Sequence, residues 1–160
     1  MKKKVNYITL VGRSEWAVVN SLWAVLHHTE VIPTEINVIY KENDKQRAEK
    51  STEGIRSILQ KKKIDADIQM HEIKDMFDIR EAADKLEVIC DKDEHIILDI
   101  TPARKAMASG AIISGMKKDV DGVFYLYIDS VKDADKPYLD IPLPRQDLVE
   151  MIGGEHYVEG

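Results

Sequence analysis

A strand-to-helix turn near the middle of the chain carries the residues best suited to bind an anion. The apolar residues of 96–100 are typical of a strand buried on both faces of a parallel sheet. Thr101 and Pro102 then end this strand and start a helix, because a threonine hydroxyl can cap free backbone N–H groups and proline needs none at the first helical position. The first helical turn places Arg104 and Lys105 beside exposed backbone donors and the positive end of the helix dipole. The sequence therefore predicts an anion site at this turn.

The rest of the chain alternates strand-like and helix-like segments. Runs rich in β-branched and aromatic residues predict strands, and apolar residues at three- and four-residue spacing predict helices. We expect strands at 4–11, 34–40, 66–72, 96–100 and 122–128, and helices at 16–28, from Asn43 or Asp44 to about 63, at 77–90 and from Pro102 onward. Toward the C-terminus we expect an extended edge strand or arm at 138–143 and one or two closing helical turns at 145–152.

This alternation predicts the fold class. We expect an α/β domain with a Rossmann-like, doubly wound, mainly parallel sheet of order 3-2-1-4-5 plus a C-terminal edge strand, with helices on both faces. Ligands of such sheets bind where the order reverses, beyond the carboxyl ends of the first and fourth strands. The loop from Gly12 to Glu15 then lies beside the loop from Thr101 to Lys105. We expect residues 1–160 to form a single domain, with a core at about 4–130 and a C-terminal arm at about 131–160.

Composition narrows the ligand class and the environment. The formal charge of −6, from 23 basic and 29 acidic side chains, argues against binding along a long nucleic acid, which needs a basic stripe. Cys90 is the single cysteine, and neither it nor the scattered histidines have the spacing of a metal site. No apolar run approaches a membrane span, and the N-terminus is too polar for a signal peptide. We expect a cytoplasmic protein that uses no cofactor and no metal.

The familiar nucleotide-binding motifs are absent from the sequence. There is no G-x-G-x-x-G after the first strand and no G-x-x-x-x-G-K-[ST], which argues against dinucleotide binding and ATP hydrolysis. A phosphorylation receiver domain has the same architecture, and Asp99, Thr101 and Lys105 invite that comparison. The loop after the first strand, however, lacks the acidic pair that would hold magnesium in a receiver domain.

The two loops together resemble the CRISPR-associated Rossmann-fold family, called CARF domains. In that family the first strand ends in a short Gly/Ser-bearing loop, which corresponds here to Gly-Arg-Ser-Glu-Trp at 12–16. The fourth strand ends in an Asp-x-Thr-Gly-Gly-x-Lys-like turn followed by Met, which corresponds here to Asp-Ile-Thr-Pro-Ala-Arg-Lys-Ala-Met at 99–107. The Asp, Thr, Lys and Met match. Pro102 and Ala103 replace the paired glycines, which removes one N–H donor and some backbone freedom.

The resemblance implies a homodimer whose joined clefts bind a cyclic oligoadenylate, most often cyclic tetra-adenylate, the second messenger of type III CRISPR immunity. Some members only sense the ring and relay the signal to an effector domain or protein. Others, the ring nucleases, cleave it without metal to 2′,3′-cyclic phosphate products. The resemblance implies Lys105 as the catalytic electrostatic stabiliser and Ser14 as the catalytic group that orients the phosphate or the 2′-OH. The ligand-binding residues it implies are Gly12, Arg13, Ser14, Glu15, Trp16, Asp99, Thr101, Ala103, Arg104 and Lys105.

Plainer roles stay open for several of these residues. Ser14 can cap the helix that follows it, and Arg13 can pair with Glu15 or with a partner chain. Trp16 can belong to the core, and Asp99 can hold a backbone turn. The small residues of the helix after the fourth strand suit either close packing or a dimer interface. For the whole chain, the alternative is an unrelated nucleotide-binding or flavodoxin-like α/β enzyme. The sequence leaves open whether a ring is cleaved or only bound.

Overall fold

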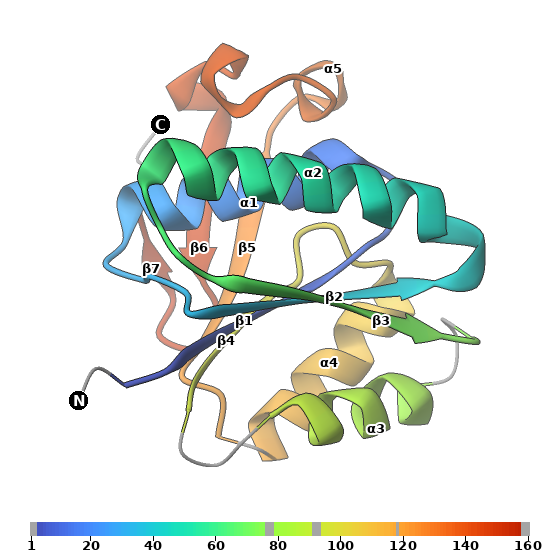
Figure 1. The fold of residues 1–160 in the computed structure, drawn as a ribbon. Coiled ribbons are helices and arrows are strands. Elements are labelled where there is room, and N and C mark those ends of the chain that lie inside the picture. The colour runs from blue at the N-terminus through green and yellow to red at the C-terminus, as the bar shows by residue number, and fades with distance from the viewer. Residues whose placement is uncertain (1–2, 76–78, 91–93, 118, 158–160) are drawn as a thin grey trace.

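The computed structural model describes residues 3–75, 79–90, 94–117 and 119–157. Within these residues, the strands form a seven-stranded sheet of order β3-β2-β1-β4-β5-β6-β7 (Figure 1). The strands are β1 (Val5–Leu10), β2 (Glu35–Lys41), β3 (Asp67–Ile73), β4 (His95–Asp99), β5 (Gly122–Ile128), β6 (Gln146–Glu150) and β7 (Glu155–His156). The helices are α1 (Glu15–His28), α2 (Lys45–Lys62), α3 (Ile79–Ile89), α4 (Lys105–Lys117) and α5 (Val131–Ala134). The first two residues of the helix predicted at 77–90 lie outside the described residues.

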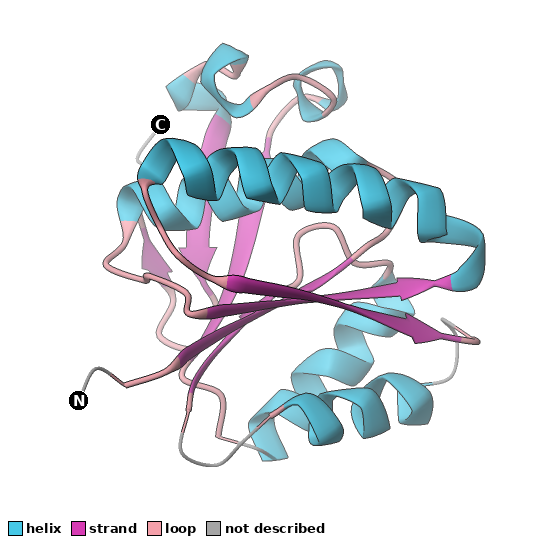
Figure 2. Ribbon diagram, in the orientation of Figure 1, coloured by secondary structure: helices cyan, strands magenta, loops and turns pink. Residues whose placement is uncertain are grey.

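The parallel part of the sheet confirms the predicted doubly wound fold. β1 pairs in parallel with β2 and β4, β2 with β3, and β4 with β5. α1 and α2 cover one face, and α3 and α4 cover the other (Figure 2). The first face buries a core that includes Val18, Leu22 and Ile55, and the second buries one that includes Leu86 and Met107. Because both faces are covered, the central strands are apolar along most of their length.

The C-terminal part differs from the prediction. The predicted edge strand at 138–143 consists of short 3₁₀ turns at Tyr138–Asp140 and Leu143–Arg145, and the predicted helix at 145–152 contains the strand β6. The reason lies in Pro142 and Pro144, which lack the N–H that a sheet ladder needs. β6 instead pairs antiparallel with β5, and β7 pairs antiparallel with β6. The sheet therefore gains its additional edge strands, but from residues later in the chain.

The helix after β4 also begins later than the sequence predicts. Its first residue is Lys105 rather than Pro102, and residues 101–104 form a non-helical turn. The Thr101 hydroxyl accepts a hydrogen bond from the Leu126 backbone N–H on β5 at 2.9 Å. The Ala103 N–H donates back to the Ile100 carbonyl at 3.1 Å. Thr101 thus ties the turn to the neighbouring strand instead of capping α4.

A ladder of polar side chains crosses the amino-terminal half of the sheet. Asn37 on β2 donates to Asn6 on β1 at 2.9 Å and to Glu35 at 2.9 Å, while its side-chain oxygen lies 2.6 Å from His71 Nε2 on β3. Asn6 in turn donates to Glu94, just before β4, at 3.1 Å. Both asparagines are fully buried, so each needs these partners. Burial lowers the pKa of His71, and a nearby lysine adds to this effect.

Membrane-spanning helices are not among the described elements. Each helix in the described part of the chain is too short or too polar to cross a lipid bilayer.

Candidate functional site

The loops after β1 and β4 touch each other at the carboxyl edge of the sheet. β1 and β4 are neighbours, with Thr9 paired to Asp99 at their carboxyl ends. Beyond them, Gly12 packs so tightly on the second loop that a Cβ added to it would lie 1.8 Å from the Pro102 carbonyl oxygen. Only glycine fits such a close backbone approach. The structure therefore brings together the two loops that the predicted strand order places side by side.

Asp99 supports the second loop from inside the protein. Its carboxylate has no exposure and accepts hydrogen bonds from the Ser21 hydroxyl at 2.6 Å, the Thr9 hydroxyl at 3.0 Å and the Thr101 backbone N–H at 3.0 Å. Burial raises the pKa of Asp99, and the hydrogen bonds from Ser21, Thr101 and Thr9 oppose this rise. In this structure Asp99 holds the turn, which is the plainer of its two predicted roles; a contact with the ligand stays a prediction.

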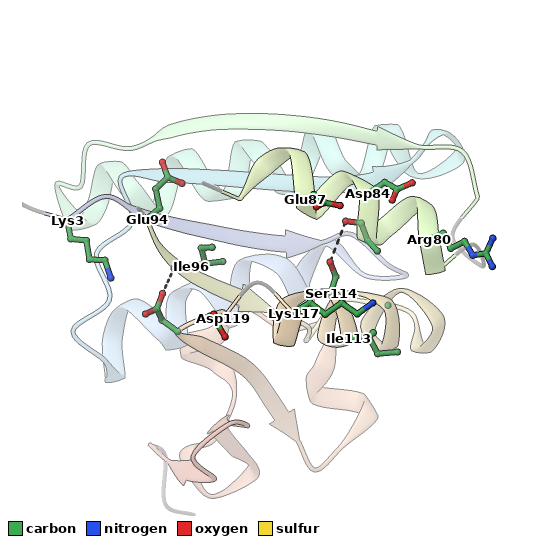
Figure 3. A pocket seen from close by; sticks show the side chains of 13 residues that line it. Lys3, Arg80, Asp84, Glu87, Glu94, Ile96, Ile113, Ser114, Lys117 and Asp119 are labelled. Atoms are coloured by element: carbon green, nitrogen blue, oxygen red, sulfur yellow. Dashed lines mark hydrogen bonds between the residues drawn. The ribbon is translucent and has the colours of Figure 1, made fainter. Parts of the chain in front are cut away.

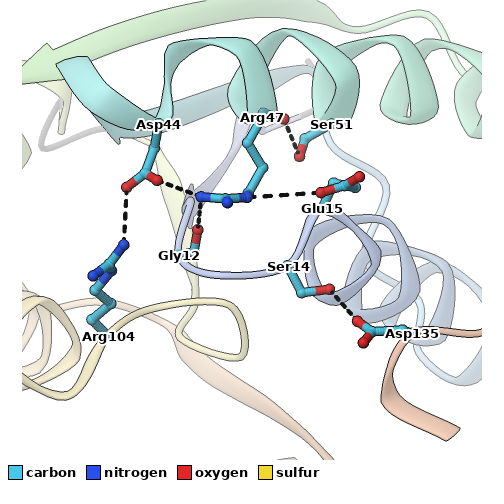
Figure 4. A network of polar contacts seen from close by, with 8 residues as sticks. All are labelled: Gly12, Ser14, Glu15, Asp44, Arg47, Ser51, Arg104 and Asp135. Atoms are coloured by element: carbon cyan, nitrogen blue, oxygen red, sulfur yellow. Dashed lines mark hydrogen bonds and ion pairs between the residues drawn. The ribbon is translucent and has the colours of Figure 1, made fainter. Parts of the chain in front are cut away.

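An arginine that sequence reasoning missed holds the first loop. Arg47, on the first turn of α2, donates to the Gly12 carbonyl oxygen at 3.0 Å and hydrogen-bonds to Asp44 (Figure 4). Its Nε lies 3.7 Å from a carboxylate oxygen of Glu15. The other oxygen of Asp44 lies 3.5 Å from Nη2 of Arg104, on the second loop. The buried Asp44 carboxylate thus connects both loops to the start of α2.

Glu15 and Arg13 do not form the pair that the sequence suggests. Glu15 belongs to the first turn of α1 and pairs with Arg47, while the Arg13 side chain is exposed. Within the described part of the chain, the backbone N–H groups of Arg13 and Ser14 have no hydrogen-bond partner. Free consecutive N–H groups just before a helix are suited to an anion.

Ser14 contacts the C-terminal part of the chain. It occupies the N-cap position of α1 but makes no side-chain cap; its hydroxyl donates instead to Asp135 Oδ1 at 3.0 Å (Figure 4). Asp135 follows α5, and neither α5 nor this contact is evident from the sequence. The residues beside Asp135 are anchored: buried Asp133 pairs with Lys136 and with Arg145. These two partners lower the pKa of Asp133 through hydrogen bonds.

The remaining predicted residues take different positions around the loops. Lys105 is exposed at the start of α4, and Arg104 is partly buried, with its Nε enclosed and unpartnered among the described residues. Ala103 uses its N–H inside the turn. Trp16 is 36% exposed and lines an apolar groove of about 370 Å³ between α1, α2 and the segment at 137–139. Its ring therefore belongs neither to the core nor to the contact between the two loops.

The structure also contains a larger cavity of about 950 Å³ between α3 and α4 (Figure 3). Its walls include Lys3, Ile96 and Asp121, which lie at the amino ends of the strands, so it opens at the edge opposite to the two loops. Side chains of both signs line it, among them Asp84 and Lys117. Among the described residues, no cluster of histidine, cysteine and acidic side chains could hold a metal ion. The two loops at the carboxyl edge remain the better candidate for anion binding.

Comparisons by sequence find no relatives. No protein-family model matches the chain, and no curated protein matches it.

Comparison of structures does find relatives. Can2 from Sulfobacillus thermosulfidooxidans, in complex with cyclic tetra-adenylate, is similar with a TM-score of 0.63 and 15% identity, over 97% of this chain and 37% of Can2. A type III CRISPR defence DNA nuclease activated by cyclic oligoadenylate is similar with a TM-score of 0.61 and 14% identity, over 98% of this chain and 21% of that protein. Enterococcus italicus Csm6 bound to cyclic hexa-2′-fluoro-hexa-dAMP is similar with a TM-score of 0.56 and 9% identity, over 95% of this chain and 43% of Csm6.

These likenesses establish the class of fold. The chain has the CARF fold, as the resemblance of its two loops implies. It spans less than half the length of each of these solved relatives.

Proposed function

We propose that this chain binds a cyclic oligoadenylate, with cyclic tetra-adenylate as the preferred ring, at the two loops of a homodimer. The observation that carries the proposal is the direct contact of the Gly12 and Pro102 loops at the carboxyl edge of a CARF fold. Can2, which has this fold, is solved with cyclic tetra-adenylate bound. The proposal extends this ligand class to the present chain.

The charge around the loops supports an anionic ligand. The chain carries a net charge of −6, yet Arg13 and Lys105 project from these loops as exposed cations, and free N–H groups adjoin Arg13. The acidic residues Asp44 and Glu15 are paired with Arg47, which reduces their repulsion of a phosphate. Local cations and donors in an otherwise acidic protein favour a compact anionic ligand over a long nucleic acid.

A homodimer would give a two-fold ring a two-fold site. We propose that the second copy covers the face of β5 opposite to α1, beside α4. On this face Tyr125 and Tyr127 are 38% and 48% exposed. The face adjoins the ligand loops, because Leu126, between these tyrosines, donates its N–H to the Thr101 hydroxyl. Two copies joined here would bring their carboxyl-edge loops close to each other.

The chain acts either as a sensor or as a metal-independent ring nuclease. In cleavage, a ribose 2′-oxygen bonds to the adjacent phosphorus and loses its proton, while the bond from phosphorus to the 5′-oxygen breaks and that oxygen gains a proton. The products carry 2′,3′-cyclic phosphates. The role proposed for Lys105 is to stabilise the negative charge on the phosphorane, because its ammonium group is unpaired and exposed among the described residues.

Cyclic tetra-adenylate in the presence of EDTA tests both forms of the proposal. Binding is measured by calorimetry and ring opening by chromatography, for the wild type, Lys105→Ala and the control Lys117→Ala, at the far end of the same helix. Binding with an intact ring supports a sensor. Linear products that fall at least 100-fold in Lys105→Ala alone support a nuclease, since electrostatic groups of this kind contribute about 10²–10³ in rate. A wild-type protein that does not bind the ring refutes the proposal.

A further inference from the structure

The Ser14 hydroxyl has already used its hydrogen. A serine hydroxyl has one O–H donor and two acceptor lone pairs, and Ser14 donates to Asp135 Oδ1 at 3.0 Å. It therefore offers only acceptor lone pairs to a ligand. A phosphate oxygen is itself an acceptor and gains nothing from this hydroxyl, and the Asp135 carboxylate repels it. The contact thus favours a ligand group that donates a hydrogen bond.

The chain on both sides of Asp135 is fixed, so the contact does not depend on a loose surface residue. Asp133 is 1% exposed and pairs with Arg145 at 3.0 Å and with Lys136. The Lys136 carbonyl accepts a hydrogen bond from Asn20 of α1 at 2.8 Å, and Asn20 is itself 1% exposed. These anchors tie the Asp135 backbone to the helix that Ser14 begins.

We propose that Asp135 is a specificity-determining residue that makes Ser14 an acceptor for a ribose 2′-hydroxyl of the ligand. This inference rests on the proposed binding of a cyclic oligoadenylate. The free N–H of Arg13 suits a phosphate, and Ser14 is its immediate neighbour along the chain, within about 3.8 Å between Cα atoms. In a nucleotide ring the donor that lies this close to a phosphate is the 2′-hydroxyl, because the base amine lies at the far end of the nucleotide. The loop would thus distinguish RNA-type from deoxy-type rings.

A ring without 2′-hydroxyl donors tests the inference. Affinities for cyclic tetra-adenylate and for its 2′-fluoro analogue are measured with the wild type, Asp135→Ala, Ser14→Ala and the control Asp140→Ala, which removes an exposed acid from the same part of the chain. Fluorine cannot donate a hydrogen bond. We expect the wild type and Asp140→Ala to prefer the hydroxyl ring by about tenfold, the size of one good hydrogen bond.

In Asp135→Ala the Ser14 hydroxyl keeps its acceptor lone pairs but can also donate to the ligand, so we expect the preference to become smaller than in the wild type, whereas Ser14→Ala removes both and should lose the preference. The ratio of the two affinities cancels any general effect of the lost negative charge. Equal affinity of the wild type for both rings, or an unchanged ratio in Asp135→Ala, overturns this inference while leaving the proposed function intact. A wild type that binds neither ring overturns the proposed function and the inference with it.

Discussion

The contact between Gly12 and Pro102 makes Gly12→Ala the most direct test of how the site is built. The new Cβ would lie 1.8 Å from a carbonyl oxygen, whereas real Cβ contacts stay beyond 3.0 Å, so the two loops must move apart to accommodate it. Neither side yields easily. The obstacle is backbone rather than a side-chain tip, and the Gly12 carbonyl is held by Arg47 at 3.0 Å.

Overpacking of this kind costs about 1–3 kcal/mol, and we expect about 2 kcal/mol here because both atoms belong to held backbone. For a chain of this length, that cost corresponds to a fall in Tm of about 4–8 °C. Urea unfolding and thermal unfolding monitored by circular dichroism measure it. The control is Gly153→Ala, whose Cβ would lie 3.3 Å from the end of the Glu150 side chain, and we expect a change within about 0.5 kcal/mol. A Gly12→Ala protein with the Tm of the wild type would refute the close contact of the two loops.

Two further experiments test Arg47 and the two histidines with lowered pKa values. Arg47→Ala removes the hydrogen bond that holds the first loop, so we expect the free energy of unfolding, measured in urea, to fall by about 1–2 kcal/mol. The control Arg56→Ala, which replaces an exposed arginine on the same helix, should lower it by less than about 0.5 kcal/mol. Equal losses in the two variants would contradict the role assigned to Arg47. Burial lowers the pKa of His28 and His71 below 6.5, so the unfolded chain binds more protons as the pH falls through that value, and stability should decrease there. Replacing both histidines with glutamine should make the free energy of unfolding depend less on pH between pH 7 and pH 5. An unchanged pH dependence would exclude these histidines as its cause.

The parallel sheet could be predicted from the sequence because its signals are local. The apolar runs of β1, β2 and β4 and the helical spacing between them identify the elements, and the preference for right-handed crossovers then limits their order. The predicted ends of helices and strands are wrong where a contact with a residue far along the chain determines them. Thr101 reads as a helix cap, but its hydroxyl binds Leu126 on the next strand, and α4 begins four residues later. The prediction of an edge strand at 138–143 is wrong because the prolines of this segment cannot join a sheet ladder, and the edge strand forms after Arg145 instead.

In the candidate site, too, the features with local sequence signals could be predicted and the contacts between distant residues could not. Gly12 and Thr101 belong to loops whose composition is unusual, and the strand order alone places these loops together. Arg47 is one of several basic residues on a charged helix, and it reaches Gly12 across 35 positions of sequence. Asp135 reaches Ser14 across 121 positions. Local patterns carry no information about such pairs, so only the folded chain reveals which polar residue supports which loop.

The buried ladder through Asn6, Asn37 and His71 determines more than local stability. Sliding one strand by two residues keeps every side chain on its own face of the sheet, so hydrophobic burial alone discriminates weakly against that error. The amides do discriminate, because a slip would leave buried donors and acceptors unpaired at about 1–3 kcal/mol each. A two-residue slip would also shift one strand end by about 6.6 Å relative to its neighbour. The ladder therefore fixes the height at which β1 ends relative to β2, so that the Gly12 loop after β1 lies level with Asp44 and Arg47, which follow β2 and hold that loop.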